Sequence, residues 1–516
     1  MLSMFQAFFE AGDSGELEER RTLFERLRLK IYDTRSFELH FAQYDVVYID
    51  FSNLRGVKDK KEFDTMFGCQ LSDEVIRHED LGHFKDVTEL TDLEMIEIMS
   101  TPNDSTKIVL EKAFFELSRI LHNATGRKIL VLVDEYDTPV SSAANEGTYI
   151  YVQKFLRRVF STLLRKTPYI FGALLVGILR CEKSGFLSNV PSVKFYPLAY
   201  EADLYGDSCF FTEEEVRTLY DHDKALHPHL GFSYDTMKQL YGSYVGAKQE
   251  LYSPWAVCRA FESQSLRMYW NESGPGYFLS KHIFGLGDHL LDLYASLLGG
   301  SSISPTIHGR LYHISYGNLT PNDIIGLFYY AGYLTEVKPN TFEILNNEVR
   351  GAYVAWLRYH IVSSPTFRKL RDSASAVVEV AISGTIAKFR SLFRKCFEQD
   401  YFSLIKRKGR NMNKIFVLGI LMDARNPLID FTVLRHSYLG VVAFGLHDSR
   451  TNSAAIVVLS SRALHLRSSP QRAASSLLSR INFNSLSSQL PQRITFSSQN
   501  MYRIMWYCVR YIRLIE

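Results

Sequence analysis

The chain has 516 residues, of which 46% are hydrophobic and 13% aromatic, so it is long enough for two to four domains with sizeable cores. Its six cysteines lie far apart and form no CxxC pair, which argues against a zinc ribbon and against a disulfide framework. The formal net charge of +3 is unevenly placed, because the stretch 462–516 holds eight arginines, no lysine and one acidic residue.

Targeting signals are not apparent. No apolar run reaches the length of a membrane span. The N-terminal sequence lacks the basic region and the following apolar stretch of a signal peptide. Composition therefore predicts an intracellular protein, cytoplasmic or nuclear, with free thiols and no membrane partner.

Predicted helices and strands alternate in the first part of the chain. Helical sequence over 1–10, 16–29, 72–98, 106–123 and 149–164 is interrupted by three apolar strands, predicted over 44–51, 129–133 and 169–179. The first strand ends at Asp50, and Gly126 ends the helix that precedes the second. The order strand, helix, strand, helix, strand predicts an α/β fold with a parallel sheet and crossover helices.

Beyond residue 205 the pattern becomes mainly helical. Thr212 and Glu215 have the spacing of a capping box, and helical sequence continues to about residue 298 apart from a turn over 242–252. A helix over 320–333, with Thr320 as its cap and Pro321 in its first turn, precedes two short strands over 333–337 and 341–345, the outline of a winged-helix-like module. After a linker at 363–365 we predict a helix over 385–406, an apolar stretch over 415–422, and strands over 439–446 and 454–459.

The most informative stretch is Lys128–Val140, which reads KILVLVDEYDTPV. Five apolar residues followed at once by carboxylates and a proline are typical of a central parallel strand that is buried on both faces. Ligands of open α/β sheets bind at the carboxyl ends of the strands. Asp134 can therefore hold a hydrated Mg²⁺ and Glu135 can polarise an attacking water, as in the Walker B motif of nucleotide hydrolases. The alternative is an acidic turn that only ends the strand.

Several segments together resemble the AAA-ATPase-like family, whose P-loop ATPase is often fused to a PD-(D/E)XK nuclease-like domain. They occur in the family's order and cover roughly residues 2 to 360. The matching segments are LSMFQAFFE, VVYIDFS, ILVLVDEYDTPV, LLVGILRCEKSGFLSNV, FTEEEVRTLY, YSPWAVCRAF, MYWNESG, FYYAGYLT and ILNNEVRGAYVAWL.

The resemblance implies ATP and Mg²⁺ as cofactors, with Asp134 at the metal and Glu135 in catalysis. Asp137 belongs to the same motif, either as a catalytic residue or as a ligand of the turn. Arg180 and Lys183 match basic residues that follow the next strand in the family. They can neutralise phosphate charge as catalytic and nucleotide-binding residues, or they are ordinary solvated loop charges.

The sequence also departs from the family. No GxxxxGK[ST] occurs in these 516 residues, so the phosphate-cradling loop is missing. In the family this loop directly precedes the LSMFQAFFE helix, which suggests that the sequence is truncated before residue 1 and lacks the first strand. Val176 stands where the family tends to have a small polar residue. The strand over 454–459 lacks the acid and the lysine of a nuclease site, and Asp448 has no catalytic partner, so nuclease activity is not expected.

These features predict five parts: a truncated ATPase-like core over 1–205, a helical lid over 206–300, a winged-helix-like module over 301–362, a degenerate α/β nuclease-like domain over 366–461 and a basic Ser/Arg-rich tail over 462–516. Three functions remain open. The chain belongs to an ATPase whose P-loop is encoded upstream, it is a pseudo-ATPase scaffold that contacts nucleic acid through Arg462–Glu516, or it is a fragment whose unpaired sheet edge makes it poorly soluble. His78 and His83 have no spacing partner that would make a metal site.

Overall fold

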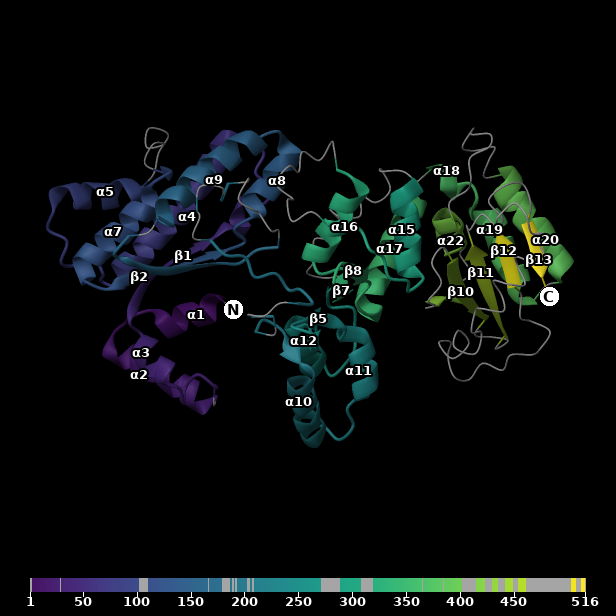
Figure 1. Cartoon of the computed structure of the whole chain (residues 1–516), viewed down its shortest axis with the longest axis horizontal. Coiled ribbons are helices and arrows are strands. Elements are labelled where there is room, and N and C mark those ends of the chain that lie inside the picture. Colours follow the sequence, from purple (N-terminus) through teal and green to yellow (C-terminus); the bar gives the residue numbers. More distant parts are fainter. Residues whose placement is uncertain are drawn as a thin grey trace. The chain divides into compact units, whose positions relative to one another are not determined.

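The structure is a computed structural model. It describes residues 2–27, 29–101, 110–165, 167–178, 186–187, 190, 193–201, 205–206, 208–270, 288–307, 319–363, 365–383, 385–400, 414–422, 429–434, 441–448, 453–460, 503–506 and 512–515. The chain divides into two compact units, residues 1–195 with 308–319 and residues 196–307 with 320–516 (Figure 1). Among the described residues, no helix combines the length and the apolar character that a membrane span requires.

The first unit is built on a parallel three-stranded sheet of order β1-β2-β3. The strands are β1 (Tyr44–Asp50), β2 (Lys128–Asp134) and β3 (Ile170–Leu175). The helices are α1 (Leu2–Phe9), α2 (Ser14–Arg26), α3 (Arg35–His40), the 3₁₀ helix η1 (Phe51–Leu54), α4 (Lys60–Asp80), α5 (Leu90–Ser100), α7 (Ala113–Thr125), α8 (Thr138–Glu146) and α9 (Tyr149–Leu163). The predicted parallel sheet with crossover helices is thus confirmed.

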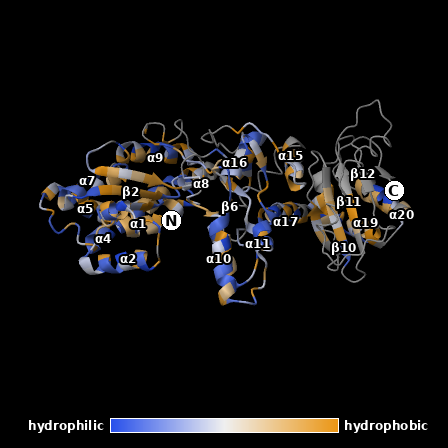
Figure 2. Cartoon of the chain, turned by 60° about the horizontal axis from the view of Figure 1, so that its bottom comes forward, coloured by the Kyte–Doolittle hydropathy of each residue, from blue (hydrophilic) through white to orange (hydrophobic). Residues whose placement is uncertain are grey.

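Helices cover both faces of this sheet. On one face, Leu2 of α1 packs on Val46 and Leu132. Alternate residues of the same strands, such as Val47 and Val131, are fully buried on the other face, where α4 and α7 pack (Figure 1). Because β2 has a neighbour on each side and helices above and below, its apolar run is buried, as predicted (Figure 2).

Strand β3 differs from its prediction. It is shorter than the predicted strand over 169–179, and it is not buried on both faces, since Phe171 and Leu174 are 47% and 37% exposed. The reason is position: in the part of the chain that the structure describes, β3 pairs only with β2. A continuous apolar run does not by itself distinguish a central strand from an edge strand.

In the structure, the predicted helix over 72–98 is replaced by two separate helices. Helix α4 begins earlier, at Lys60, where the side chain of Asp59 caps it, and it ends before Gly82, whose φ of +71° suits glycine. The second helix, α5, begins at Leu90. By contrast, α7 ends where expected, at Gly126 in the left-handed conformation.

The second unit begins with a small antiparallel sheet of order β4-β6-β5 and its helices. The elements are β4 (Phe211–Thr212), α10 (Glu213–Leu226), α11 (Tyr234–Tyr241), β5 (Tyr244–Gly246), β6 (Gln249–Tyr252), α12 (Pro254–Ser263), α15 (Asp288–Leu298), α16 (Pro321–Tyr330), β7 (Thr335–Lys338), β8 (Thr341–Glu343) and α17 (Asn347–Ser363). Both predicted caps are present, as capping boxes at Thr212 and Thr320. A helix followed by a two-stranded hairpin is therefore observed over α16, β7 and β8, while its identity as a winged-helix-like module stays a prediction.

The predicted turn over 242–252 is a hairpin. Strands β5 and β6 pair through a two-residue turn in which Ala247 and Lys248 both have positive φ, +49° and +61°. Such turns usually contain asparagine or glycine. Because Ala247 and Lys248 stand there instead, the sequence did not predict the hairpin.

The last described elements are α18 (Pro365–Arg368), α19 (Arg371–Ser383), α20 (Ile386–Arg394), the π-helix η4 (Lys395–Asp400), α22 (Lys414–Met422), β9 (Ile429–Leu434), β10 (Val441–Asp448), β11 (Ser453–Ser460), β12 (Arg503–Trp506) and β13 (Ile512–Ile515). Strands β10 and β11 match the two predicted ones, and β9 joins them in an antiparallel sheet. Most of the basic stretch 462–516 lies outside the described residues.

Candidate functional site at the carboxyl ends of the parallel strands

Two aspartates end neighbouring strands at the same edge of the sheet. Asp50 closes β1 and Asp134 closes β2, and the two are direct partners in the parallel register. The sequence predicted the polar ends of both strands, but only the register brings these two residues side by side. This edge is where α/β folds bind their ligands.

Each of these aspartates uses one carboxylate oxygen locally. Asp50 Oδ1 accepts from the amide of Ser52 at 2.8 Å, and Asp134 Oδ1 accepts from the amide of Glu135 at 3.0 Å. Burial raises the pKa of Asp134, and the negative charges of Asp50 and Glu135 raise it further. A nearby cation would relieve this repulsion.

Glu135 has a strained backbone and a well-held side chain. Its φ is +48°, in the left-handed region that side chains other than glycine and asparagine rarely adopt. Both of its carboxylate oxygens accept from Arg55 Nη2, at 2.9 and 2.8 Å, and one also accepts from Thr138 Oγ1 at 2.7 Å. Arg55 follows η1, 80 residues earlier, so sequence reasoning did not associate the two residues.

Asp137 lies deeper than its two neighbours in the motif. It is 3% exposed, and its Oδ1 accepts from the amide of Ile178 at 3.0 Å. It thereby ties the segment after β2 to the segment after β3. Gly177 permits this approach, since a Cβ there would lie 2.2 Å from Asp137 Oδ1 and 2.6 Å from the ring of Tyr136. The side chain of Asp137 makes no capping bond to α8, and its role in the motif stays a prediction.

The remaining predicted site residues cannot be compared with the structure. Arg180 and Lys183 lie outside the described residues. Val176 is described, and it packs against the apolar cluster under α1 that includes Leu2 and Val46.

The carboxylates at this edge supply only part of the ligands that a Mg²⁺ ion needs. In the part of the chain that the structure describes, no three His, Cys, Asp or Glu side chains converge to hold a metal ion. Asp50 and Asp134 supply oxygen ligands of the hard kind that Mg²⁺ prefers. Mg²⁺ is usually held by one or two carboxylates, with water and substrate phosphates completing its shell. These two residues therefore fit a hydrated Mg²⁺ that arrives with a phosphate ligand.

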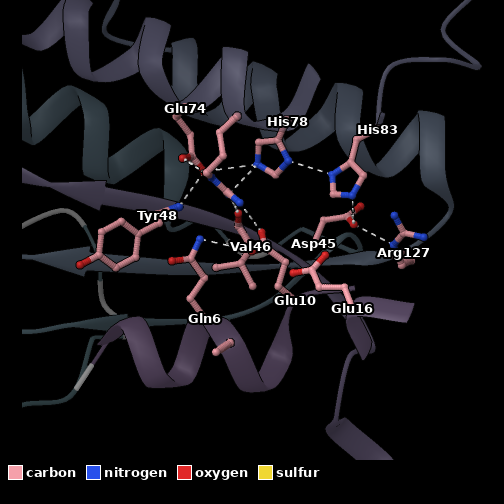
Figure 3. A network of polar contacts seen from close by, with 12 residues as sticks. Gln6, Glu10, Glu16, Asp45, Val46, Tyr48, Glu74, His78, His83 and Arg127 are labelled. Carbon is pink, nitrogen blue, oxygen red and sulfur yellow. Dashed lines mark hydrogen bonds and ion pairs between the residues drawn. The ribbon is translucent and has the colours of Figure 1, made fainter. Parts of the chain in front are cut away.

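A second polar cluster, which sequence reasoning missed, lies along the side of β1 that faces away from β2, where Glu10 also forms a parallel β-bridge with Tyr44 (Figure 3). Arg77 of α4 donates to Val46 O at 2.5 Å, and Glu74 accepts from the amide of Tyr48 at 2.8 Å. Arg77 also binds both oxygens of Glu74 and, at 2.5 Å, Glu10. The Glu74–Arg77 pair thus satisfies the backbone groups that a further strand would otherwise bind, and it closes this edge to strand addition.

The same cluster continues toward the start of β1. His78 Nδ1 and His83 Nδ1 are 2.8 Å apart, and His83 Nε2 lies 3.8 Å from Asp45 Oδ1. Asp45, fully buried, also accepts from Arg127 Nε at 2.7 Å and from Thr125 Oγ1 at 2.5 Å. The Glu-x-x-Arg-His spacing on a polar helix was the available signal, since residues three and four apart share one face.

Comparison with known proteins agrees with this architecture for the N-terminal part. Residues 1–187 match the family model described as Predicted AAA-ATPase. The chain is also similar to a protein of Azotobacter chroococcum mcd 1 described as "Uncharacterized protein in vnfD 5'region", with 27% identity over 168 residues, or 32% of this chain and 31% of that protein. The chain thus spans just under a third of that relative's length. No solved structure matches. Residues 1–187 of this chain therefore match the AAA-ATPase-like family that the sequence resembles.

Proposed function

We propose that the carboxyl ends of β1 and β2 form the acidic half of a Mg²⁺-nucleotide site. The observation that carries the proposal is the register pairing of Asp50 with Asp134, directly followed by Glu135. Asp134 would hold the metal, with Asp50 beside it. When bound, Mg²⁺ would neutralise charge on the phosphates.

Glu135 is the residue suited to polarise an attacking water in this proposal. Its carboxylate is engaged by Arg55 and Thr138, so it would have to exchange at least one of these bonds for the water. Arg180 and Lys183 remain proposed as phosphate ligands. Asp137 is proposed to hold the loop rather than to take part in the reaction, because it is buried and accepts from the Ile178 amide.

The absence of GxxxxGK[ST] from these 516 residues limits what the acidic half can do alone. Most of the contact with the β- and γ-phosphates in P-loop proteins comes from that loop. Turnover therefore requires phosphate ligands beyond the acidic half. The sharper question is whether Asp134 supports nucleotide binding.

A titration with a fluorescent ATP analogue in the presence of Mg²⁺ tests the proposal. We expect Asp134→Ala to abolish binding and Asp33→Ala, which removes an exposed aspartate between α2 and α3, to leave it unchanged. Asp134→Asn separates the loss of charge from the loss of the side chain. If the folded wild-type chain binds no nucleotide, the proposal is wrong for this chain.

The second candidate function is a non-catalytic scaffold that contacts nucleic acid through Arg462–Glu516. It is favoured by the eight arginines of that stretch. Binding to a single-stranded oligonucleotide should then weaken steeply with salt, because each phosphate contact releases a counterion. Binding that is absent at low salt would exclude this role.

A further inference from the structure

The polar cluster beside β1 has three buried carboxylates but only two arginines, which are partly exposed. Its carboxylates are Glu10 of α1, Asp45 of β1 and Glu74 of α4, with relative exposures of 9%, 0% and 4%. Its permanent cations are Arg77 and Arg127. The neighbouring ion pair between Arg20 and Glu16 of α2 adds no net charge. With all three carboxylates ionised and both imidazoles neutral, the cluster carries one negative charge in excess, which is costly in a buried place. Burial also raises the pKa of Glu10, although Arg77 opposes this shift.

The imidazoles of His78 and His83 can together accept one proton more than they carry when both are neutral. Their Nδ1 atoms are 2.8 Å apart, so a single hydrogen lies between them. At the outer end of His78, Nε2 lies 3.2 Å from both the guanidinium of Arg77 and Oε1 of Glu74. When the pair is neutral, Arg77 donates to this nitrogen. When the pair has gained a proton, the nitrogen donates to Glu74 instead.

The other end of the pair faces a carboxylate as well. His83 Nε2 lies 3.8 Å from Asp45 Oδ1. A singly protonated pair therefore presents an N–H to Glu74 at one end and an N–H to Asp45 at the other, and the cluster becomes neutral. A second proton would place two N–H groups against each other at 2.8 Å, which the contact does not allow.

We propose that the His78–His83 pair holds a single exchangeable proton and acts as a pH-sensitive latch between α4 and the edge of β1. When the pair carries one proton beyond its neutral form, the latch is closed. With two protons the imidazoles separate, and the end of α4 loses its attachment to Asp45. In agreement with this, burial lowers the pKa of His83 to about 4; Asp45 opposes the shift, while the charges of His78, Arg127 and Arg77 add to it.

Proton counting tests the proposal. Between about pH 5 and pH 6 an unfolded chain carries protons on most of its histidines. If the folded pair holds one proton and the unfolded pair two, the unfolding constant of the wild type rises about tenfold per pH unit of acidification relative to a variant without the pair. The reference variant is His78→Gln with His83→Gln. His40→Gln, which removes a partly exposed histidine of the same unit outside the cluster, is the matched control and should leave the slope unchanged.

The readout must report on the first unit. All four tryptophans, at 255, 270, 356 and 506, belong to the other unit, so hydrogen exchange of β1 and α4 peptides in rising urea is the suitable measurement. A slope difference of about tenfold per pH unit supports one proton. No difference would mean that the folded pair binds two protons, and about a hundredfold would mean that it binds none; either result overturns the proposal.

A second measurement needs no variant that removes both imidazoles. In histidine spectra of the isotope-labelled full chain, His78 and His83 should titrate together, with the uptake of one proton for the pair. Single variants at each position assign the two signals. Two independent titrations near the usual histidine value would overturn the latch even if the double variant does not fold.

Discussion

Replacement of Arg77 by methionine probes how α4 is held on the edge of β1. Methionine keeps the apolar stem but removes all of the donors of the guanidinium. The change would leave the Glu74 side chain, which is 4% exposed, and the Glu10 side chain, which is 12% exposed, without their cation. It would also leave Val46 O without its donor from α4.

The expected cost follows from these contacts. Removing one partner of a buried ion pair typically destabilises a protein by about 3–5 kcal/mol, because the remaining charge is left uncompensated. The Arg77 side chain is itself 27% exposed, so water can partly replace it. We therefore expect Arg77→Met to lower the free energy of unfolding of the first unit by about 3 kcal/mol, the lower end of that range.

Hydrogen exchange of β1 and α4 peptides in rising urea measures this loss. The matched control is Arg21→Met, because Arg21 pairs with Glu38 at 3.2 Å with side chains that are 37% and 65% exposed. Exposed pairs of this kind contribute about 0–1 kcal/mol. If Arg77→Met costs no more than Arg21→Met, the cluster does not hold the edge of the sheet and our reasoning about it is wrong.

Three further predictions concern the candidate site. Gly177→Ala should destabilise the first unit by about 1–3 kcal/mol, because its Cβ would meet Asp137 Oδ1 at 2.2 Å; thermal melting that matches wild type would contradict this. Arg55→Ala should cost less than about 1 kcal/mol in denaturant unfolding, since Arg55 is 65% exposed, and a larger loss would show that the pair with Glu135 is structural. Burial raises the pKa of Asp134, so its charged form opposes folding; Asp134→Asn should stabilise the unit at neutral pH. The gain should shrink as the pH falls through the folded pKa and disappear below the lower pKa of the unfolded chain. Unfolding curves at several pH values check this, and a gain that persists at low pH would refute it.

Local patterns determined the sheet and the residues at its end. The apolar run Ile129–Val133 and the carboxylates after it predict a central parallel strand, and β2 is one. The caps at Thr212 and Thr320 were likewise readable, because a cap depends on residues three apart in the sequence. Backbone periodicity and capping are short-range properties, so one sequence is enough to predict them.

The tertiary structure alone decided which charges meet. Arg55 reaches Glu135 across 80 residues, and Arg77 joins Glu10, 67 residues away. His83, for which the sequence showed no partner that would make a metal site, meets His78 and Asp45 only because α4 packs on β1. The position of β3 at the side of the described sheet was also unreadable. Ion pairs and strand neighbours depend on the relative placement of distant segments, and no periodicity along the chain encodes that placement.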